Sequence, residues 1–272
     1  MSPTPFLANH VRSLITDRVG SYGRTVVYRS SIGCVCDICG GPKSADFPHC
    51  RSCDATIQAA IRQGSDSDLA DRVRLGYYAI EYDDQMYKVI HNYKINNDAA
   101  IEYRSTIKTL LLDPLLLHAQ CLTMVAGESP TAWATVPSTE TSERYGTTHP
   151  LNVIVQSILG TALPEIHLDA TGRKERRFSN SLFTLAEKPS MQLLRHVLLI
   201  EDSWASGTTV QSAASALKRA GAGQVSVFCL ARILDLRWCE RMYGKAVADG
   251  FRRVPFNESA CIWGRGPHPL GR

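Results

Sequence analysis

A pair of acidic residues, Glu201 and Asp202, separates an apolar run at 197–200 from a loop of small and hydroxyl-bearing residues at 203–209. An uninterrupted apolar run of this kind is typical of a parallel strand buried on both faces. Ligands of α/β proteins bind at the carboxyl ends of such strands, where the next helix begins. Amides and hydroxyls at a helix N-terminus attract phosphate, whereas carboxylates repel it. We therefore expect loop 206–209 to bind phosphate, and the carboxylates to bind sugar hydroxyls or magnesium.

The residues after this loop predict the elements that position it. Apolar residues recur there at the spacing of one helix face: Val210, Ala213, Ala214 and Leu217. Lys218 and Arg219 suit a helix C-terminus, Gly221 ends the helix, and 225–230 is a second apolar run. The segment therefore predicts a βαβ unit with the acidic pair and the loop at the end of its first strand.

Four of the nine cysteines form two C-x2-C pairs separated by ten residues: Cys36, Cys39, Cys50 and Cys53. Zinc prefers four tetrahedral soft ligands, and a C-x2-C turn brings two thiolates to one ion. Four ligands leave no open position, so we predict a structural zinc site in a short knuckle. Cys34 and His49 lie beside the pattern and remain alternative ligands; a redox dithiol is the other interpretation.

The remaining cysteines are scattered along the chain, and we expect them to be small buried apolar side chains: Cys121, Cys229, Cys239 and Cys261.

Composition restricts the class of protein further. The chain has 272 residues, of which 44% are apolar and 21% charged, and its formal net charge is +4. No run approaches the ~20 apolar residues of a membrane span, and 1–20 lacks the pattern of a signal peptide. We therefore expect a cytoplasmic protein. The mild charge does not favour a dedicated nucleic-acid-binding protein.

The segment VLLIEDSWASGTT at 197–209 resembles the ribose-phosphate-binding signature of type I phosphoribosyltransferases. Together with the cysteine knuckle it resembles the ComF family of competence-associated proteins, over roughly residues 34–233. The resemblance implies an α/β fold of the type I phosphoribosyltransferase kind, with a central, mainly parallel sheet and a small N-terminal zinc ribbon or knuckle. The expected domains are an N-terminal extension (1–33), the knuckle (34–54), the phosphoribosyltransferase-like domain (55–233) and a C-terminal extension of unknown role (234–272).

The same resemblance implies that the ligand is phosphoribosyl pyrophosphate or a 5-phosphoribosyl nucleotide, bound with Mg²⁺. The residues expected to bind the phosphoribosyl group are Glu201, Asp202, Ser203, Ala205, Ser206, Gly207, Thr208 and Thr209. Those that resemble the family's valine-proline strand end, and are expected to bind pyrophosphate, are Val136, Pro137 and Ser138. Segment 86–94 resembles a family segment that ends in a lysine.

Two cations are candidate catalytic clamps on the leaving group. Arg144 lies where the family has an Arg-Gly-Phe-Asn-Gln type stretch, and Lys174 lies in the basic run 173–177. That run is either a lid that closes over pyrophosphate or a solvated loop.

The chain also departs from the family pattern. Asn152 is followed by Val153 where glutamine is expected, and Glu201 stands where aspartate is usual. Ala205 cannot accept a proton, so the chain does not resemble hypoxanthine-guanine enzymes. Trp204 either stacks on a base or partner or packs beneath the loop.

These features favour a phosphoribosyltransferase, broadly a glycosyltransferase of nucleotide metabolism, with an unidentified acceptor that supplies the nucleophile. The alternative is a non-catalytic nucleotide-binding protein, or a DNA uptake or processing protein of the ComF type. DNA, a DNA-processing protein and a second copy of the chain are its candidate macromolecular partners.

The rest of the chain predicts further elements. Helices are expected at 9–17, 55–62, 98–112 and 151–159, and strands at 25–28, 131–137 and 166–168. Residues 75–82 and 86–90 predict a hairpin around Asp83 and Asp84, and 264–269 should be irregular.

Overall fold

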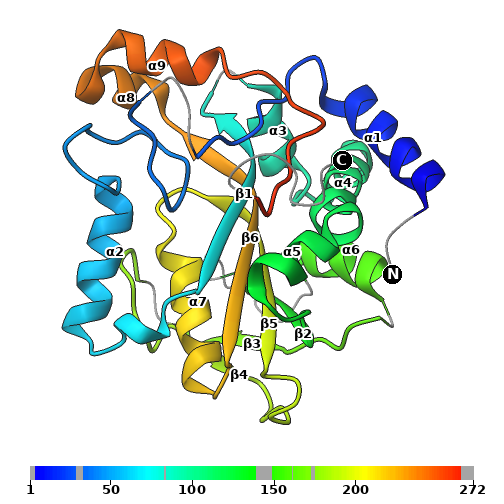
Figure 1. Cartoon of the computed structure of the whole chain (residues 1–272), viewed down its shortest axis with the longest axis vertical. Helices are drawn as coiled ribbons and strands as arrows, with labels where there is room; N and C mark the ends of the chain where they lie inside the picture. Colours follow the sequence, from blue (N-terminus) through cyan, green and yellow to red (C-terminus); the bar gives the residue numbers. More distant parts are fainter. Residues whose placement is uncertain are drawn as a thin grey trace.

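The computed structural model describes residues 4–28, 33–82, 84–138, 149–160, 162–172 and 175–264. Its centre is a sheet of four parallel strands in the order β1-β6-β5-β2 (Figure 1). The strands are β1 (Arg72–Ile80), β2 (Ala132–Thr135), β5 (His196–Trp204) and β6 (Gln224–Leu234). The predicted α/β class with a mainly parallel central sheet is therefore confirmed.

The apolar runs along the chain become strands buried on both faces. In β5, Val197 and Leu199 face one hydrophobic core, while Leu198 and Ile200 face the other. Period-two alternation of side chains between two covered faces requires apolar residues at every position, which explains the uninterrupted run.

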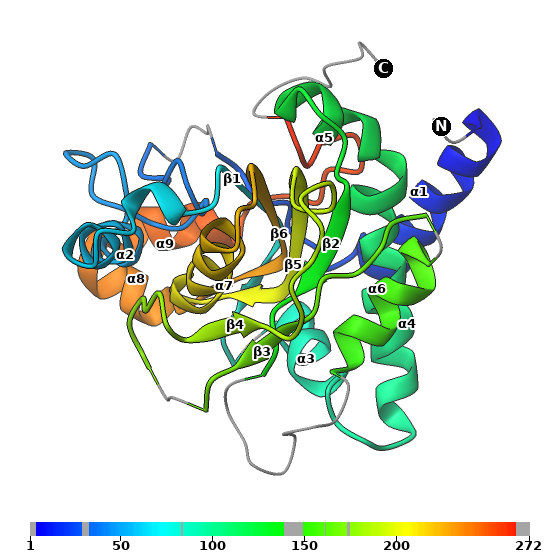
Figure 2. The same cartoon turned by 90° about the horizontal axis from the view of Figure 1, so that it is seen from below.

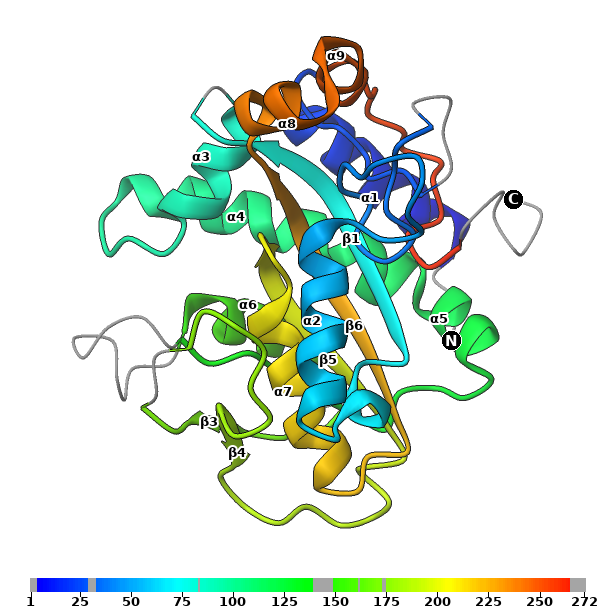
Figure 3. The ribbon, with the colours of Figure 1, turned by 90° about the vertical axis from the view of Figure 1, so that its left-hand side faces the viewer.

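The first core is covered mainly by α2, α7, the cysteine cluster and a small hairpin, and the second by most of the remaining helices (Figures 2 and 3). The elements on the first face are α2 (Arg51–Arg62), the short turn η1 (Asp66–Asp68), β3 (Leu168–Ala170), β4 (Phe183–Leu185), α7 (Thr208–Arg219), α8 (Leu236–Tyr243) and α9 (Lys245–Arg252). Those on the second face are α1 (Pro5–Val19), α3 (Gln85–Asn92), α4 (Ala99–Leu112), the π-helical turn η2 (Asp113–Leu117), α5 (Ala119–Ala126) and α6 (Pro150–Leu159).

Most predicted elements are present with shifted ends. The helices expected at 9–17, 55–62, 98–112 and 151–159 correspond to α1, α2, α4 and α6, and strand 131–137 corresponds to β2. Segment 25–28 makes only an isolated bridge from Thr25 to Tyr77. Near 166–168, Glu165 makes a parallel bridge to Trp133, and β3 begins at Leu168.

The hairpin predicted around 83–84 is wrong, because its second half is the helix α3. The Asp84 carboxylate accepts a hydrogen bond from the Met86 amide at 3.2 Å and caps that helix. Met86, Val89 and Ile90 are buried at the i, i+3, i+4 spacing of one helix face. An aspartate before a short apolar segment suits a turn and a helix cap equally, and here the cap is formed.

No single helix of the described residues is long and apolar enough to cross a membrane. The bent pair of helices at 99–117 and 119–126 reaches that length and apolar composition only when the two are counted together.

His196, the first residue of β5, is fully buried between two hydrogen-bonding partners. Its Nδ1 lies 2.9 Å from the Glu128 carbonyl, which can only accept, so Nδ1 carries the proton. Its Nε2 lies 2.8 Å from the Ser226 hydroxyl and accepts from it. Burial lowers the pKa of His196, so the imidazole stays neutral in the folded protein.

We expect acid to destabilise the protein through His196. The unfolded chain takes up a proton near the ordinary histidine pKa of about 6.5, whereas native His196 resists it, so stability present above that pH is lost as the pH falls. His196→Gln should remove this part of the dependence, up to about 1.4 kcal/mol of unfolding free energy per pH unit. Urea unfolding at a series of pH values measures the slope. The exposed His10→Gln is the control, and equal slopes in wild type and His196→Gln would contradict the prediction.

Candidate functional site

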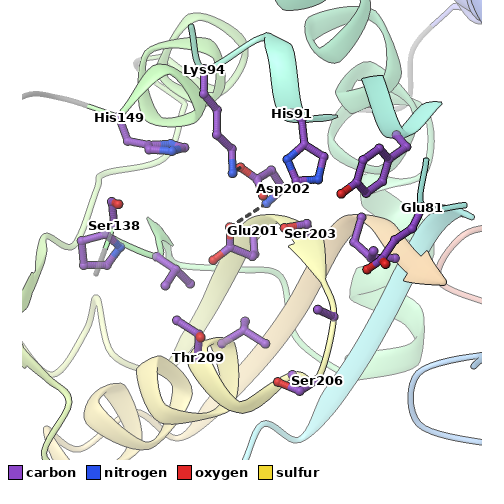
Figure 4. Close-up of a pocket in the computed structure, with 17 residues that line it drawn as sticks. Glu81, His91, Lys94, Ser138, His149, Glu201, Asp202, Ser203, Ser206 and Thr209 are labelled. Carbon is purple, nitrogen blue, oxygen red and sulfur yellow. Dashed lines mark hydrogen bonds and ion pairs between the residues drawn. The ribbon is translucent and has the colours of Figure 1, made fainter. Parts of the chain in front are cut away.

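A pocket of about 530 Å³ lies at the carboxyl ends of the parallel strands (Figure 4). The end of every strand of the main sheet contributes to it: Glu81 after β1, Ser138 after β2, Glu201 and Asp202 in β5, and Ile233 in β6. This is the edge at which parallel α/β sheets bind their ligands. The predicted acidic pair, the loop after it and the β2 strand end therefore lie in one cavity.

Asp202 is a buried carboxylate held by two donors from the end of α3. It is 1% exposed, its Oδ2 accepts from the Tyr93 hydroxyl, and Lys94 Nζ lies 2.8 Å from the same oxygen. Burial alone would raise the pKa of Asp202, but the Lys94 charge and the hydrogen bonds from Lys94 and Tyr93 hold it below its usual range. Asp202 is therefore the ionised member of the pair.

The pKa of Glu201 is shifted in the opposite direction from that of Asp202. Burial and the neighbouring Asp202 charge raise the pKa of Glu201 well above its usual value. Its Oε1 accepts from the Asp202 amide at 2.9 Å. Two adjacent carboxyl groups with pKa values pushed apart divide the roles, one retaining a proton and the other a charge. The pair thus presents both a hydrogen-bond donor and an acceptor to a hydroxylated ligand.

The loop between β5 and α7 is shaped by Trp204 and Gly207. Gly207 has φ +84°, and a Cβ placed on it would lie 2.1 Å from the Trp204 ring. Trp204 is 2% exposed, so it packs beneath the loop; of the two alternatives for this residue, the structure places it under the backbone. Glycine is required here by conformation and by close approach alike.

The loop presents hydroxyl groups and the start of α7 to the pocket. Ser206 Oγ and Thr208 Oγ1 lie 2.9 Å apart, and Ser206 and Thr209 line the cavity (Figure 4). The first backbone N–H groups of a helix have no partner within the helix, and the first turn of α7 contains no acidic residue. This end of the pocket is therefore suited to an anion.

Most predicted site residues lie in this pocket, and two lie outside the described part of the chain. Those that line it are Glu201, Asp202, Ser203, Ala205, Ser206, Gly207, Thr209, Val136, Pro137 and Ser138. Thr208 begins α7 beside them and contributes its backbone and its contact with Ser206. Arg144 and Lys174 fall outside the described residues.

The pocket also includes residues that the sequence interpretation did not assign. They are Glu81, Tyr87, His91, Lys94 and His149. Lys94 is the lysine that ends segment 86–94, but residues 86–90 of that segment were interpreted as a strand, so Lys94 was not placed beside Asp202. His149 caps α6, with Nδ1 3.3 Å from the Leu151 amide. Nothing in the local sequence predicts that His149 lies in the site.

The cysteine cluster lies in the same hydrophobic core as Trp204. The four sulfur atoms lie within 4.8 Å of one another and are buried, and Cys39 Sγ is 3.7 Å from Cys50 Sγ. Two thiolates on one tetrahedral zinc ion, each about 2.3 Å from it, lie about 3.8 Å apart. The cluster is thus compact enough to hold a metal ion. Among the described residues, Cys34 and His49 are not part of this group.

Local structure explains how the two pairs converge. The Cys36 amide donates to the Gly41 carbonyl at 2.8 Å, and the Gly40 amide donates to the Cys36 carbonyl at 2.9 Å, which closes the first turn. Cys50 and Cys53 lie at the start of α2, one at the N-cap and the other in the first turn.

Arg232 connects the cysteine cluster to the loop. Its guanidinium is 6% exposed and donates to the carbonyls of Trp204 at 3.0 Å and Ala205 at 2.9 Å. Burial would lower its pKa, but thiolate charge, from Cys39 first, raises it. A Cβ on Gly41 would lie 2.5 Å from the guanidinium, so the knuckle backbone rests directly on it.

Comparison of the chain with protein-family models, with curated proteins and with solved structures finds no match. The interpretation of the site therefore depends on its own geometry.

We expect Arg232→Met to destabilise the fold, because it leaves the Trp204 and Ala205 carbonyls without their donor and the thiolate cluster without its counter-charge. Removing one partner of a buried charged pair costs about 3–5 kcal/mol. Arg232→Lys, which keeps the charge but not the planar fork of donors, should lose less. Urea unfolding measures both variants. A methionine variant as stable as wild type would show that Arg232 does not connect the two features.

Proposed function

We propose that the protein binds phosphoribosyl pyrophosphate, or a 5-phosphoribosyl nucleotide, with Mg²⁺ and transfers the phosphoribosyl group to an acceptor. The observation that carries this proposal is the single pocket that joins a strand-end carboxyl pair to a helix-capping loop of Ser, Gly and Thr. A phosphorylated sugar needs both features, an anion site and a hydroxyl site, at a fixed separation. The fold is accordingly proposed to be of the type I phosphoribosyltransferase kind.

The ligand is placed by charge. The 5-phosphate lies at Ser206–Thr209, where α7 begins, and the ribose hydroxyls contact Glu201 and Asp202. Pyrophosphate lies toward 136–138 and Lys94, the cation of the pocket that already reaches Asp202. Mg²⁺ would be held by the ligand oxygens together with Glu201 and Asp202, reached directly or through water, and would offset the charge of pyrophosphate, since hard oxygen ligands and phosphate suit it.

The four cysteines hold structural Zn²⁺ in this proposal. It is supported by four buried thiols at the spacing that tetrahedral zinc requires. A set of four thiolates is closed, so this ion takes no part in the transfer.

Transfer exchanges one bond at the anomeric carbon for another. The bond to pyrophosphate breaks, pyrophosphate leaves with the bonding electrons, and a lone pair of the acceptor forms the new bond. Positive charge develops on the sugar, so catalysis depends mostly on position and on electrostatic stabilisation. The acceptor's proton passes to a base, and the side chains of this pocket able to accept it are Glu81, His91 and His149.

Release of pyrophosphate tests the activity, and Asp202→Asn tests the site. With phosphoribosyl pyrophosphate, Mg²⁺ and a panel of bases and amines, the wild-type protein should release pyrophosphate. Asp202→Asn should bind the substrate about ten- to a hundredfold more weakly, because a hydrogen bond to a charged group is worth about 1.5–3 kcal/mol. Binding is measured by calorimetry. The exposed Asp169→Asn in β3 is the matched control and should bind normally.

The two outcomes separate the alternatives. Binding without pyrophosphate release by any acceptor would favour the non-catalytic nucleotide-binding alternative. Unchanged affinity in Asp202→Asn would contradict the assignment of the acidic pair.

The raised pKa of Glu201 predicts a pH dependence of ligand binding. Without Mg²⁺, the affinity for ribose 5-phosphate should fall as the pH rises through the Glu201 pKa, because deprotonation removes a donor and adds negative charge beside a phosphate. Glu201→Gln stays neutral, so the ratio of wild-type to variant affinity should fall with rising pH. Calorimetry at matched pH values measures this ratio, which cancels the titration of the ligand itself. A constant ratio would mean that Glu201 does not exchange its proton in this range.

A further inference from the structure

A second group of metal-ligating side chains lies on the other face of the sheet from the four-cysteine cluster. The ligand atoms of His118, Cys121 and Cys261 lie within 4.8 Å of one another, and all three residues are buried. Cys121 and Cys261 belong to the second hydrophobic core, whereas the first cluster belongs to the first. His118 is the N-cap residue of α5, Cys121 lies in the first turn of this helix, and Cys261 comes from the C-terminal segment.

The distances match one shared ion. Cys121 Sγ is 3.5 Å from His118 Nδ1. A sulfur at about 2.3 Å and a nitrogen at about 2.1 Å from a tetrahedral zinc ion lie about 3.6 Å apart. The pair therefore already has the separation that coordination imposes.

The second ring nitrogen of His118 faces a carboxylate. Its Nε2 lies 3.4 Å from Asp113 Oδ1, and Asp113 is itself buried at the start of η2. Metal-binding histidines usually direct the other nitrogen at a carboxylate or carbonyl, which fixes the tautomer and the orientation of the ring. The His118 ring therefore lies between the Asp113 carboxylate on one side and the two thiols on the other, as in such metal sites.

The same order of Cys, His and Asp occurs in nucleophilic catalysis, but burial argues against that role here. Cys121 and His118 are each 1% exposed, and neither lines the large pocket. A nucleophile must reach its substrate. A catalytic triad also has no use for the second thiol of Cys261, whereas a metal site does.

We propose that His118, Cys121 and Cys261 bind a second transition-metal ion, with Zn²⁺ as the natural occupant, and that Asp113 is a positioning residue for His118. Thiolate and imidazole ligands together select ions of this class. Three protein ligands leave the fourth tetrahedral position to a water molecule.

The site gives the C-terminal segment a role. Trp263 Nε1 donates to the Pro114 carbonyl at 3.1 Å, and Arg74 Nε donates to the Trp263 carbonyl at 3.2 Å, so residues beside Cys261 are already bound to η2 and β1. An ion shared by Cys261 and α5 would hold the C-terminal segment against the helices that cover the second core. It does not depend on the function proposed for the pocket.

Metal content of the full chain tests the proposal, with any affinity tag removed. Elemental analysis of reduced wild-type protein purified with Zn²⁺ should give two ions per chain. Cys261→Ser and His118→Gln should each lose one ion and keep the other, whereas Cys36→Ser should lose the ion of the first cluster. Cys239→Ser, a buried thiol outside both clusters, is the matched control and should keep two.

Cobalt measures the second site directly. The first Co²⁺ equivalents should give thiolate-to-metal absorption from both sites in wild type and from the four-cysteine site alone in Cys261→Ser. Asp113→Asn should weaken binding at the second site about 10–100-fold without changing the first, as expected for an orienting carboxylate. One ion per wild-type chain, or a disulfide joining Cys121 to Cys261 in the purified protein, would overturn the proposal. That count uses the wild-type chain and does not require any variant to fold.

Discussion

The buried charge of Arg232 is the constraint on which the arrangement of this protein depends. In the proposed zinc site, four thiolates around one divalent ion would carry a net negative charge, and a charge buried in an apolar core is costly unless it is paired. Arg232 supplies the opposite charge and donates to the carbonyls of Trp204 and Ala205. The guanidinium therefore balances the cluster and holds the backbone at the point where β5 becomes the loop.

The contacts continue from Arg232 into the pocket. The Trp204 carbonyl accepts from Arg232, and the Trp204 ring packs under Gly207, which is the N-cap residue of α7. The cysteine cluster shares its hydrophobic core with the sheet and α7. The knuckle is thus part of the support for the loop, through the contacts of Arg232 and Trp204.

Local patterns predicted the parts of this protein whose structure depends on neighbours in sequence. The β5–α7–β6 unit follows from apolar runs, a helical period and a terminal glycine, and the cysteine cluster follows from spacing. The prediction was wrong at α3, where Asp84 caps a helix instead of turning a hairpin, and the error hid the position of Lys94 beside Asp202. Cys121 and Cys261 were expected to be merely buried. Their closeness to His118 depends on how distant segments of the chain pack together, so it could not be predicted from local sequence. The same holds for the position of Arg232 beside the cluster.

The acidic pair beside a loop that we propose to bind phosphate is an electrostatic conflict when only the sequence is considered, and the structure resolves it. The raised pKa of Glu201 favours its neutral form, and Lys94, 2.8 Å from Asp202, offsets the charge of the other carboxyl group. The pair and the lysine together are therefore close to neutral, although two carboxyl groups are adjacent in sequence. A phosphate bound as proposed at the start of α7 would then meet the helix N-terminus without strong repulsion from Glu201 and Asp202. Because the neutrality depends on Lys94, which comes from α3 and not from the β5–α7 unit, the helix that the sequence interpretation missed is what makes the two halves of the site compatible.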